Sequence, residues 1–241
     1  MDMIEKGRER QLKKVLEILS GNIEGFYLGG GTALSFFYFQ HRVSLDIDLF
    51  TQDYSAKRIM EIVGLIEDKT RQNVELIDEI NKPEFARMKV FMVNFTGDIR
   101  IKVDFVEDFV RLLEPLNTVN GIPVLSLKDI YLRKVFAIAG TGVSSGMTGR
   151  EIIAGGREEA KDFFDVYYLS STFMPLSEFA FNFTDRAIRE NLIRWFRTYD
   201  RFRIMSGILD LETTKKVDYK TMERYFTKEI NGIIEKEVGE L

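Results

Sequence analysis

The sequence has no cysteine and only one histidine, His41. Without cysteine there is no disulfide framework, no thiolate zinc site and no cysteine nucleophile. A single histidine also excludes any site that needs two imidazole groups. Long apolar runs are missing as well, because Asp, Arg or Lys interrupts the densest ones within about a dozen residues. We therefore expect neither a signal peptide nor a membrane span, and a cytoplasmic protein.

Neither sign of charge is in large excess, since the formal net charge is −4 and the isoelectric point is near 5.4. This balance argues against a protein coated with positive charge for nonspecific nucleic-acid binding, although a local basic patch is compatible with it. An acidic total also fits a pocket of carboxylates around cations. The 241 residues, 45% of them apolar, are enough for a sizeable core.

Hydrophobic periodicity predicts alternating helices and strands in the first half of the chain. Helices are expected at 4–19, at about 33–40 with Thr32 as N-cap, and from Asp53 or Ser55 as N-cap to Lys69. Strands are expected at 23–28, 45–50, 73–78, 86–95 and 99–106, with a hairpin turn at 96–98.

The second half is predicted to be helical. After a turn at Asn120-Gly121, helices are expected at 127–139 with Ser126 as N-cap, and near 157–170, 175–183, 185–204 and 218–229. Residues 140–156 are rich in Gly and Ser and predict a flexible loop. We expect an α/β (α+β) fold, with a catalytic domain at 1–125 and a helical C-terminal lobe at 126–241.

Two aspartates share one face of the predicted strand 45–50. Side chains alternate in the run Leu-Asp-Ile-Asp-Leu, so Asp46 and Asp48 point the same way. Their backbones, about 7 Å apart, let the carboxylates converge on metal ions about 4 Å from each other, as two-metal phosphoryl transfer requires. Hard oxygen ligands favour Mg²⁺ or Mn²⁺. The alternative is a solvated edge strand without metal.

Asp104 repeats this pattern on the predicted strand 99–106. A third acid beside the first two could complete the ligand shell of a metal ion and accept the proton of an attacking hydroxyl. The alternative is an acid paired with Arg100 or Lys102, which share its face.

A glycine run, Gly29-Gly30-Gly31-Thr32, precedes the aspartates. Backbone N–H groups of a glycine turn that opens a helix bind anions, and phosphate is their natural ligand. A tight turn without any ligand explains the run as well. The chain lacks the Gly-Lys-Ser/Thr ending of a Walker A loop and the dinucleotide-binding glycine pattern.

Together these motifs resemble those of the AbiEii/AbiGii-type toxin family, a branch of the polymerase-beta-like nucleotidyltransferases. The matching residues are GGTAL at 30–34, His41-Arg42, Ser44, DIDLF at 46–50, Asp104, Asp129, Lys134, Lys161-Asp162 and DVY at 165–167. The resemblance covers roughly residues 25–170. It implies a nucleotidyltransferase-type mixed sheet flanked by helices, an NTP substrate and two Mg²⁺ or Mn²⁺ ions.

The resemblance also implies roles for single residues. The nucleotide would be bound by Gly30, Gly31, Thr32, Ser44 and Lys134, with Lys134 reaching the triphosphate or the acceptor. The catalytic, metal-binding acids would be Asp46, Asp48 and Asp104, with Asp104 as the base.

Accessory roles would belong to Arg42, Lys161, Asp162 and Asp165. Lys161 replaces the arginine of the family's Arg-Asp-x-x-Asp helix, which keeps the charge but loses bidentate geometry. From the residues alone, Asp162 and Asp165 fit a solvated or salt-bridged helix face equally well. His41-Arg42 could neutralise the aspartates or the triphosphate, and a polar helix end explains the histidine as well.

Residues 186–203 hold six arginines against Glu190 and Asp200. The apolar residues between them follow helical spacing, which predicts an amphipathic helix with a basic outer surface. The simpler interpretation is a core-facing stripe with a solvated opposite side, and the alternative is a platform for an RNA phosphate backbone.

We therefore predict a metal-dependent nucleotidyltransferase that transfers NMP from an NTP to an acceptor hydroxyl. The resemblance implies RNA, tRNA foremost, as the acceptor and a cognate antitoxin as partner, as in toxins of toxin–antitoxin pairs. Two alternatives stay open: a small-molecule nucleotidyltransferase, and a non-catalytic nucleotide-binding regulatory protein of the same fold.

Overall fold

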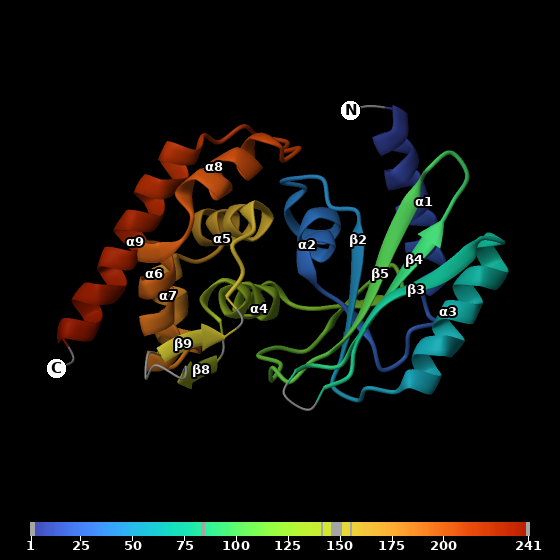
Figure 1. Ribbon diagram of the computed structural model, residues 1–241, viewed down its shortest axis with the longest axis horizontal. Helices are drawn as coiled ribbons and strands as arrows, with labels where there is room; N and C mark the ends of the chain where they lie inside the picture. The colour runs from blue at the N-terminus through green and yellow to red at the C-terminus, as the bar shows by residue number, and fades with distance from the viewer. Residues whose placement is uncertain (1–2, 83–84, 141, 146–150, 155, 240–241) are drawn as a thin grey trace. The chain divides into compact units, whose positions relative to one another are not determined.

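The computed structural model describes residues 3–82, 85–140, 142–145, 151–154 and 156–239, which belong to two compact units. Unit 1 extends to Gln40 and resumes over Ser44–Asp129, and unit 2 comprises His41–Val43 and the chain from Ile130 onward. Unit 1 contains a large sheet, and unit 2 is mainly helical (Figure 1). The division into a catalytic domain at 1–125 and a lobe at 126–241 stays a prediction.

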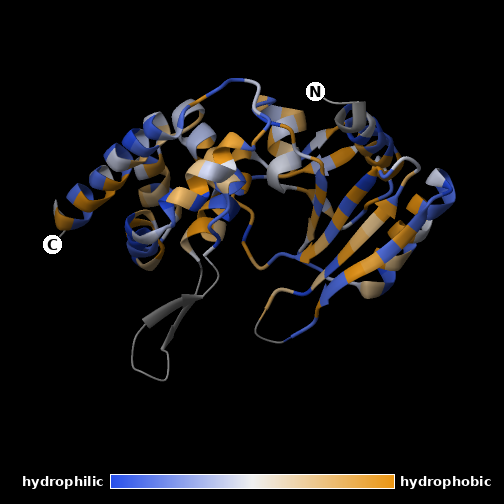
Figure 2. Cartoon of the chain, turned by 45° about the horizontal axis from the view of Figure 1, so that its top comes forward, coloured by the Kyte–Doolittle hydropathy of each residue, from blue (hydrophilic) through white to orange (hydrophobic). Residues whose placement is uncertain are grey.

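In its described part, unit 1 has a seven-stranded mixed sheet in the order β3-β4-β5-β2-β1-β7-β6. The strands are β1 Tyr27–Leu28, β2 Asp46–Thr51, β3 Asn73–Ile80, β4 Met88–Asn94, β5 Arg100–Glu107, β6 Asn117–Val119 and β7 Ile122–Val124. β2 is parallel to β5 and β1 to β7, whereas the other neighbours are antiparallel. Figure 2 shows hydrophobic and hydrophilic residues alternating along the strands. The predicted α/β fold with a mixed sheet is confirmed.

The helices of unit 1 are α1 Met3–Leu19, α2 Gly30–Ala33 and α3 Ala56–Thr70. Helix α2 continues as a π-helix, η1 Leu34–Phe39. Helices α1 and α3 contact each other and the sheet. The predicted N-cap Ser55 is confirmed, because its side chain accepts a hydrogen bond from the Arg58 backbone.

Two predicted elements of unit 1 differ in the structure. The strand expected at 23–28 is reduced to β1, because the chain first turns at Gly25, where φ is 83°. Thr32 is not an N-cap. The helix begins two residues earlier, and Gly29 is the N-cap.

The helices that follow are α4 Leu127–Ala139, α5 Ala160–Thr172, α6 Leu176–Phe183, α7 Arg186–Thr198, α8 Arg201–Leu209 and α9 Tyr219–Gly239. The single helix predicted at 185–204 is wrong. Tyr199 is extended, and Asp200 begins α8 by accepting a hydrogen bond from the Arg203 backbone.

The segment 140–156 differs from the predicted flexible loop, because Gly142–Ser145 (β8) and Glu151–Ala154 (β9) pair as antiparallel strands. Residues 141, 146–150 and 155 of that loop lie outside the described residues. Among the described helices, none is both long enough and apolar enough to cross a membrane.

Candidate active site

The two aspartates of β2 lie in the interior of the sheet, because β2 is flanked by β5 and β1. The edge-strand alternative is therefore wrong. Along β2, Ile47 and Leu49 are fully buried, while Asp46 and Asp48 on the other face are partly exposed. The apolar face fixes the strand against the core, so the two carboxylates are held on the opposite face.

Asp104 lies on β5, directly beside this pair. In the parallel β2–β5 register, Asp48 is opposite Asp104 and Asp46 is opposite Lys102. Neighbouring strands are about 4.8 Å apart, so the three carboxylates start from adjacent backbone positions. Asp104 is only 7% exposed, and Lys102 Nζ donates a hydrogen bond to its Oδ2 at 2.6 Å. Asp104 thus both joins the aspartate pair and forms the ion pair with Lys102.

Lys102 is the positive charge of this acidic cluster. Partial burial lowers the pKa of Lys102, but the hydrogen bond to Asp104 and the charges of Asp104, Asp46 and Asp48 raise it above its ordinary value. The ammonium group therefore stays charged and interacts with all three acids.

The glycine turn lies directly against Asp48. Gly30 has a φ of 66°, and a Cβ at this position would lie 2.0 Å from Asp48 Oδ2. The Gly29 backbone donates a hydrogen bond of 3.0 Å to the Asp48 carbonyl. Glycine at position 30 is thus required both by the left-handed backbone and by the close approach of the carboxylate.

Hydroxyl groups tie the turn to the start of β2. Thr32 is fully buried, its Oγ1 donates to the Asp46 backbone carbonyl, and it lies 3.1 Å from Ser44 Oγ. The structure therefore brings together the predicted residues Gly30, Gly31, Thr32, Ser44, Asp46, Asp48 and Asp104 within unit 1. Their predicted contacts with a nucleotide stay predictions.

A hard divalent cation fits this cluster by chemistry and by place. The donors are carboxylate oxygens, which Mg²⁺ and Mn²⁺ prefer. They lie next to Gly30, where a Cβ would fill the space beside the Asp48 carboxylate. In the arrangement described, no three His, Cys, Asp or Glu side chains of the described residues are placed to hold one metal ion. Metal binding by all three acids thus requires side-chain rotation, above all the release of Asp104 from Lys102.

Three of the predicted accessory residues, Arg42, Asp162 and Asp165, form a second cluster, which lies in unit 2. Asp162 and Asp165 on α5 are fully buried, so the solvated-face alternative is wrong. Asp165 accepts two hydrogen bonds from Arg42, at 2.6 Å from Nε and 2.8 Å from Nη2. His41 Nε2 lies 2.8 Å from Asp165 Oδ1, and the ring is fully buried. His41 is therefore a core residue and not a polar helix end.

Lys134, on α4, joins the same cluster. Its Nζ lies 2.6 Å from Asp162 Oδ1 and 2.7 Å from Asp165 Oδ2. Burial lowers the pKa of Lys134, but the charges of Asp165 and Asp162 together outweigh this effect. The pKa of Lys134 therefore lies above its ordinary value. Burial raises the pKa of Asp165, yet Arg42 and Lys134 bring it well below its usual range. These buried groups therefore remain charged and paired.

Lys161 is separate from this cluster. It is exposed on α5, and its side chain forms no hydrogen bond or ion pair with the rest of the described chain. The buried cluster is complete without Lys161, because Arg42 supplies a bidentate contact to Asp165.

The basic surface predicted at 186–203 is largely neutralised. Arg186 and Arg189 pair with Glu237, and Arg201 pairs with Glu223. Phe202 is 73% exposed and does not belong to the buried stripe, whose members are Ile188, Leu192, Trp195 and Tyr199. The core-facing interpretation fits this segment better than the RNA platform.

Comparisons with known proteins identify the family and the fold. A family model described as "Nucleotidyl transferase AbiEii toxin, Type IV TA system" matches residues 14–235. No curated protein matches the sequence. The solved structure of JHP933 from Helicobacter pylori is similar, with a TM-score of 0.59 and 14% identity over 99% of this chain and 97% of that one. MenT4, a nucleotidyltransferase toxin from Mycobacterium tuberculosis, has a TM-score of 0.55 and 13% identity over 95% and 85%.

Proposed function

We propose that this chain, which belongs to the AbiEii family of nucleotidyltransferase toxins of type IV toxin–antitoxin systems, transfers NMP from an NTP to an RNA hydroxyl. The first candidate acceptor is tRNA. The observation that supports this proposal is that three acids on adjacent strands lie next to the glycine turn. Asp48 is in register with Asp104 and closes onto Gly30.

In the proposed reaction the acceptor oxygen attacks the α-phosphorus, an O–P bond forms, and the bond to pyrophosphate breaks. Asp104 accepts the proton of the attacking hydroxyl. The backbone of Gly30 and Gly31, with Thr32, receives the triphosphate. Asp46, Asp48 and Asp104 would hold two Mg²⁺ or Mn²⁺ ions, which neutralise the charge that develops on the phosphoryl and leaving oxygens.

The proposal gives the cluster of unit 2 a positioning role. Asp162 and Asp165 hold the Lys134 ammonium group at a fixed place, and Arg42 balances the second carboxylate. We propose that Lys134 is the phosphate-contacting residue of this unit, with Arg42, Asp162 and Asp165 as its supports and Lys161 as an exposed accessory. A cognate antitoxin as partner and action in the cytoplasm belong to the same proposal.

The test is incubation with each α-phosphate-labelled NTP, Mg²⁺ and total RNA, followed by separation of RNA, protein and small molecules. We expect label in RNA, no label after chelation of the metal, and background label with Asp48→Asn. Asp68→Asn, an exposed acid of α3, is the matched control and should label normally. Label in a small molecule would refute the RNA acceptor, and no label in any fraction would refute nucleotidyl transfer.

A further inference from the structure

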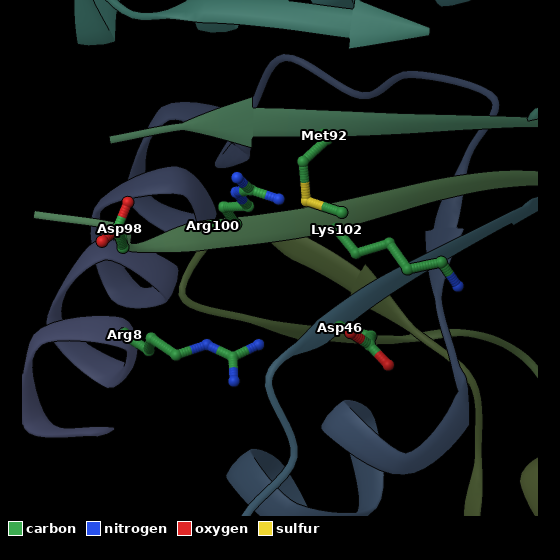
Figure 3. Close-up of a pocket in the computed structure, with 6 residues that line it drawn as sticks. All are labelled: Arg8, Asp46, Met92, Asp98, Arg100 and Lys102. Atoms are coloured by element: carbon green, nitrogen blue, oxygen red, sulfur yellow. The ribbon is translucent and has the colours of Figure 1, made fainter. Parts of the chain in front are cut away.

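A pocket of about 410 Å³ lies in unit 1 beside Asp46 (Figure 3). Its lining residues are Arg8, Asp46, Met92, Asp98, Arg100 and Lys102. Helix α1, strands β2, β4 and β5, and the turn between β4 and β5 all contribute to it. Apart from Asp46, none of these residues has a role in the function proposed above.

Three cations, Arg8, Arg100 and Lys102, and two acids, Asp46 and Asp98, line this pocket. The Lys102 side chain donates a hydrogen bond to Asp104, but the side chains of Arg8 and Arg100 form no hydrogen bond or ion pair within the described ranges. In Figure 3, Arg8 extends from α1 into the space bordered by Asp46, and Arg100 stands on β5. These two guanidinium groups differ from Arg186, Arg189 and Arg201, which have carboxylate partners.

The strand geometry explains why the cations lie next to the acids. On β5 the residues Arg100, Lys102 and Asp104 alternate with the buried Ile101 and Val103, so they share one face. Because Arg100 and Asp104 are four residues apart, this face changes from basic to acidic over about 13 Å.

The acids consequently lie between two places that suit anions. Asp48 closes onto the glycine turn, where a Cβ on Gly30 would meet its carboxylate. Asp46 lines the cationic pocket. Nucleotidyl transfer to RNA requires two polyanions, the NTP and the acceptor strand, to meet at the acids, so a second anion site is needed in addition to the glycine turn.

We propose that this pocket binds the acceptor, with Arg8 and Arg100 as ligands of the phosphate next to the reacting hydroxyl of an RNA strand. The inference rests on the function proposed above and names the acceptor site for it. Guanidinium groups suit this task because their planar fork donates two hydrogen bonds to one phosphate. The volume is within the range of pockets for small ligands, about 300–1,000 Å³, and so allows for a sugar as well as a phosphate.

The test compares Arg8→Gln/Arg100→Gln with a control, Lys14→Gln/Lys69→Gln. The control removes the same charge from exposed positions of α1 and α3 in the same unit. The probe is a fluorescent single-stranded oligoribonucleotide with a free 3′ hydroxyl, and binding is measured by anisotropy at several salt concentrations. Binding of each NTP with Mg²⁺ is measured in parallel, and circular dichroism checks the fold.

We expect the arginine variant to bind the oligoribonucleotide roughly ten- to a hundredfold more weakly, because charge-assisted hydrogen bonds are lost. The slope of log affinity against log salt should fall by about 0.7, the value for one phosphate contact on a single strand. NTP binding and the control variant should be unchanged. Equal weakening in the control, or no weakening in either variant, would overturn the proposal.

Two further arms identify the source of the phosphate. An oligomer with a methylphosphonate at the last linkage should bind the wild type as weakly as the normal RNA binds the arginine variant. Ribose 5-phosphate should compete with the RNA only at a far higher concentration. Competition at the concentration of the RNA would show that the pocket binds a small phosphate and not an RNA strand. If RNA binding depends on the arginines while the wild type transfers no label, the proposed function fails and the anion site stands.

Discussion

Gly30→Ala tests the link between the glycine turn and Asp48. Two effects act at this position. Alanine in the left-handed region costs about 1–2 kcal/mol, and the new Cβ would lie 2.0 Å from Asp48 Oδ2, where ordinary contact begins at 3.4 Å. The carboxylate must therefore rotate away, which costs a further 0.5–1.5 kcal/mol or so if it leaves its rotamer.

Two glycines separate these effects. Gly21 has a φ of 69°, and no heavy atom lies within 4 Å of the place that a Cβ would occupy, so Gly21→Ala carries only the backbone cost. Gly64 lies inside α3 with the same open space, and Gly64→Ala should stabilise by about 1 kcal/mol. We expect the free energy of unfolding to fall by about 2–3 kcal/mol for Gly30→Ala and by about 1 kcal/mol for Gly21→Ala.

The assays are urea unfolding followed by circular dichroism and incorporation of labelled NTP at 25 °C. A loss of this size leaves a typical domain folded, whereas a displacement of about 1 Å in a catalytic group costs roughly a hundredfold in rate. Incorporation should therefore drop about a hundredfold for Gly30→Ala and stay near wild type for the other two variants. Equal activity of Gly30→Ala and Gly21→Ala would refute the proposed role of the turn in placing Asp48.

Two predictions concern the buried cluster of unit 2, where the only tryptophan, Trp195, reports unfolding by fluorescence. Asp165→Asn should lower the free energy of unfolding by about 3–5 kcal/mol, because it leaves buried cations without their partner, while the exposed control Asp210→Asn should stay within about 0.5 kcal/mol. The pKa of Asp165 is lower in the folded protein than its unfolded value of about 3.9, so its stabilisation is present above that value and is lost as the pH falls through the folded pKa. The urea midpoint of the wild type should therefore decrease below about pH 5. The midpoint of Asp165→Asn should decrease less steeply with falling pH. Equal pH dependence of the two midpoints would contradict the stabilising role of the Asp165 carboxylate.

The alternation of residues was enough to predict the faces of β2 and β5, because side-chain direction follows from local geometry. The pairing of the two strands was not predictable in the same way. The register that puts Asp48 beside Asp104 joins residues far apart in the chain and depends on how the whole sheet assembles. Arg8 gave no signal at all, since nothing in its own sequence neighbourhood indicates which pocket it lines.

Helix boundaries show a similar limit. The apolar spacing continues through Tyr199 to Phe202, so periodicity alone predicted one helix where the structure has two. Asp200, an N-cap residue type followed by helix-compatible sequence, was the available signal for the break. For Asp162 and Asp165, spacing showed only that they share a face. The burial of Asp165 depends on Arg42, which comes from a segment more than a hundred residues earlier, and that of Asp162 depends on Lys134.

The two acidic clusters differ in how their carboxylates are paired with cations. In unit 2, Asp162 and Asp165 are matched by Lys134 and Arg42, and full burial is tolerable because every charge has a partner.

In unit 1, Asp46, Asp48 and Asp104 all interact with Lys102, and the first two remain partly exposed. Carboxylates that lie on adjacent backbone positions and reach solvent are suitable ligands for an added cation. A cation that binds there must compete with Lys102 for Asp104. The buried cluster of unit 2 is therefore suited to hold structure in place, and the partly exposed cluster of unit 1 is suited to bind charged ligands.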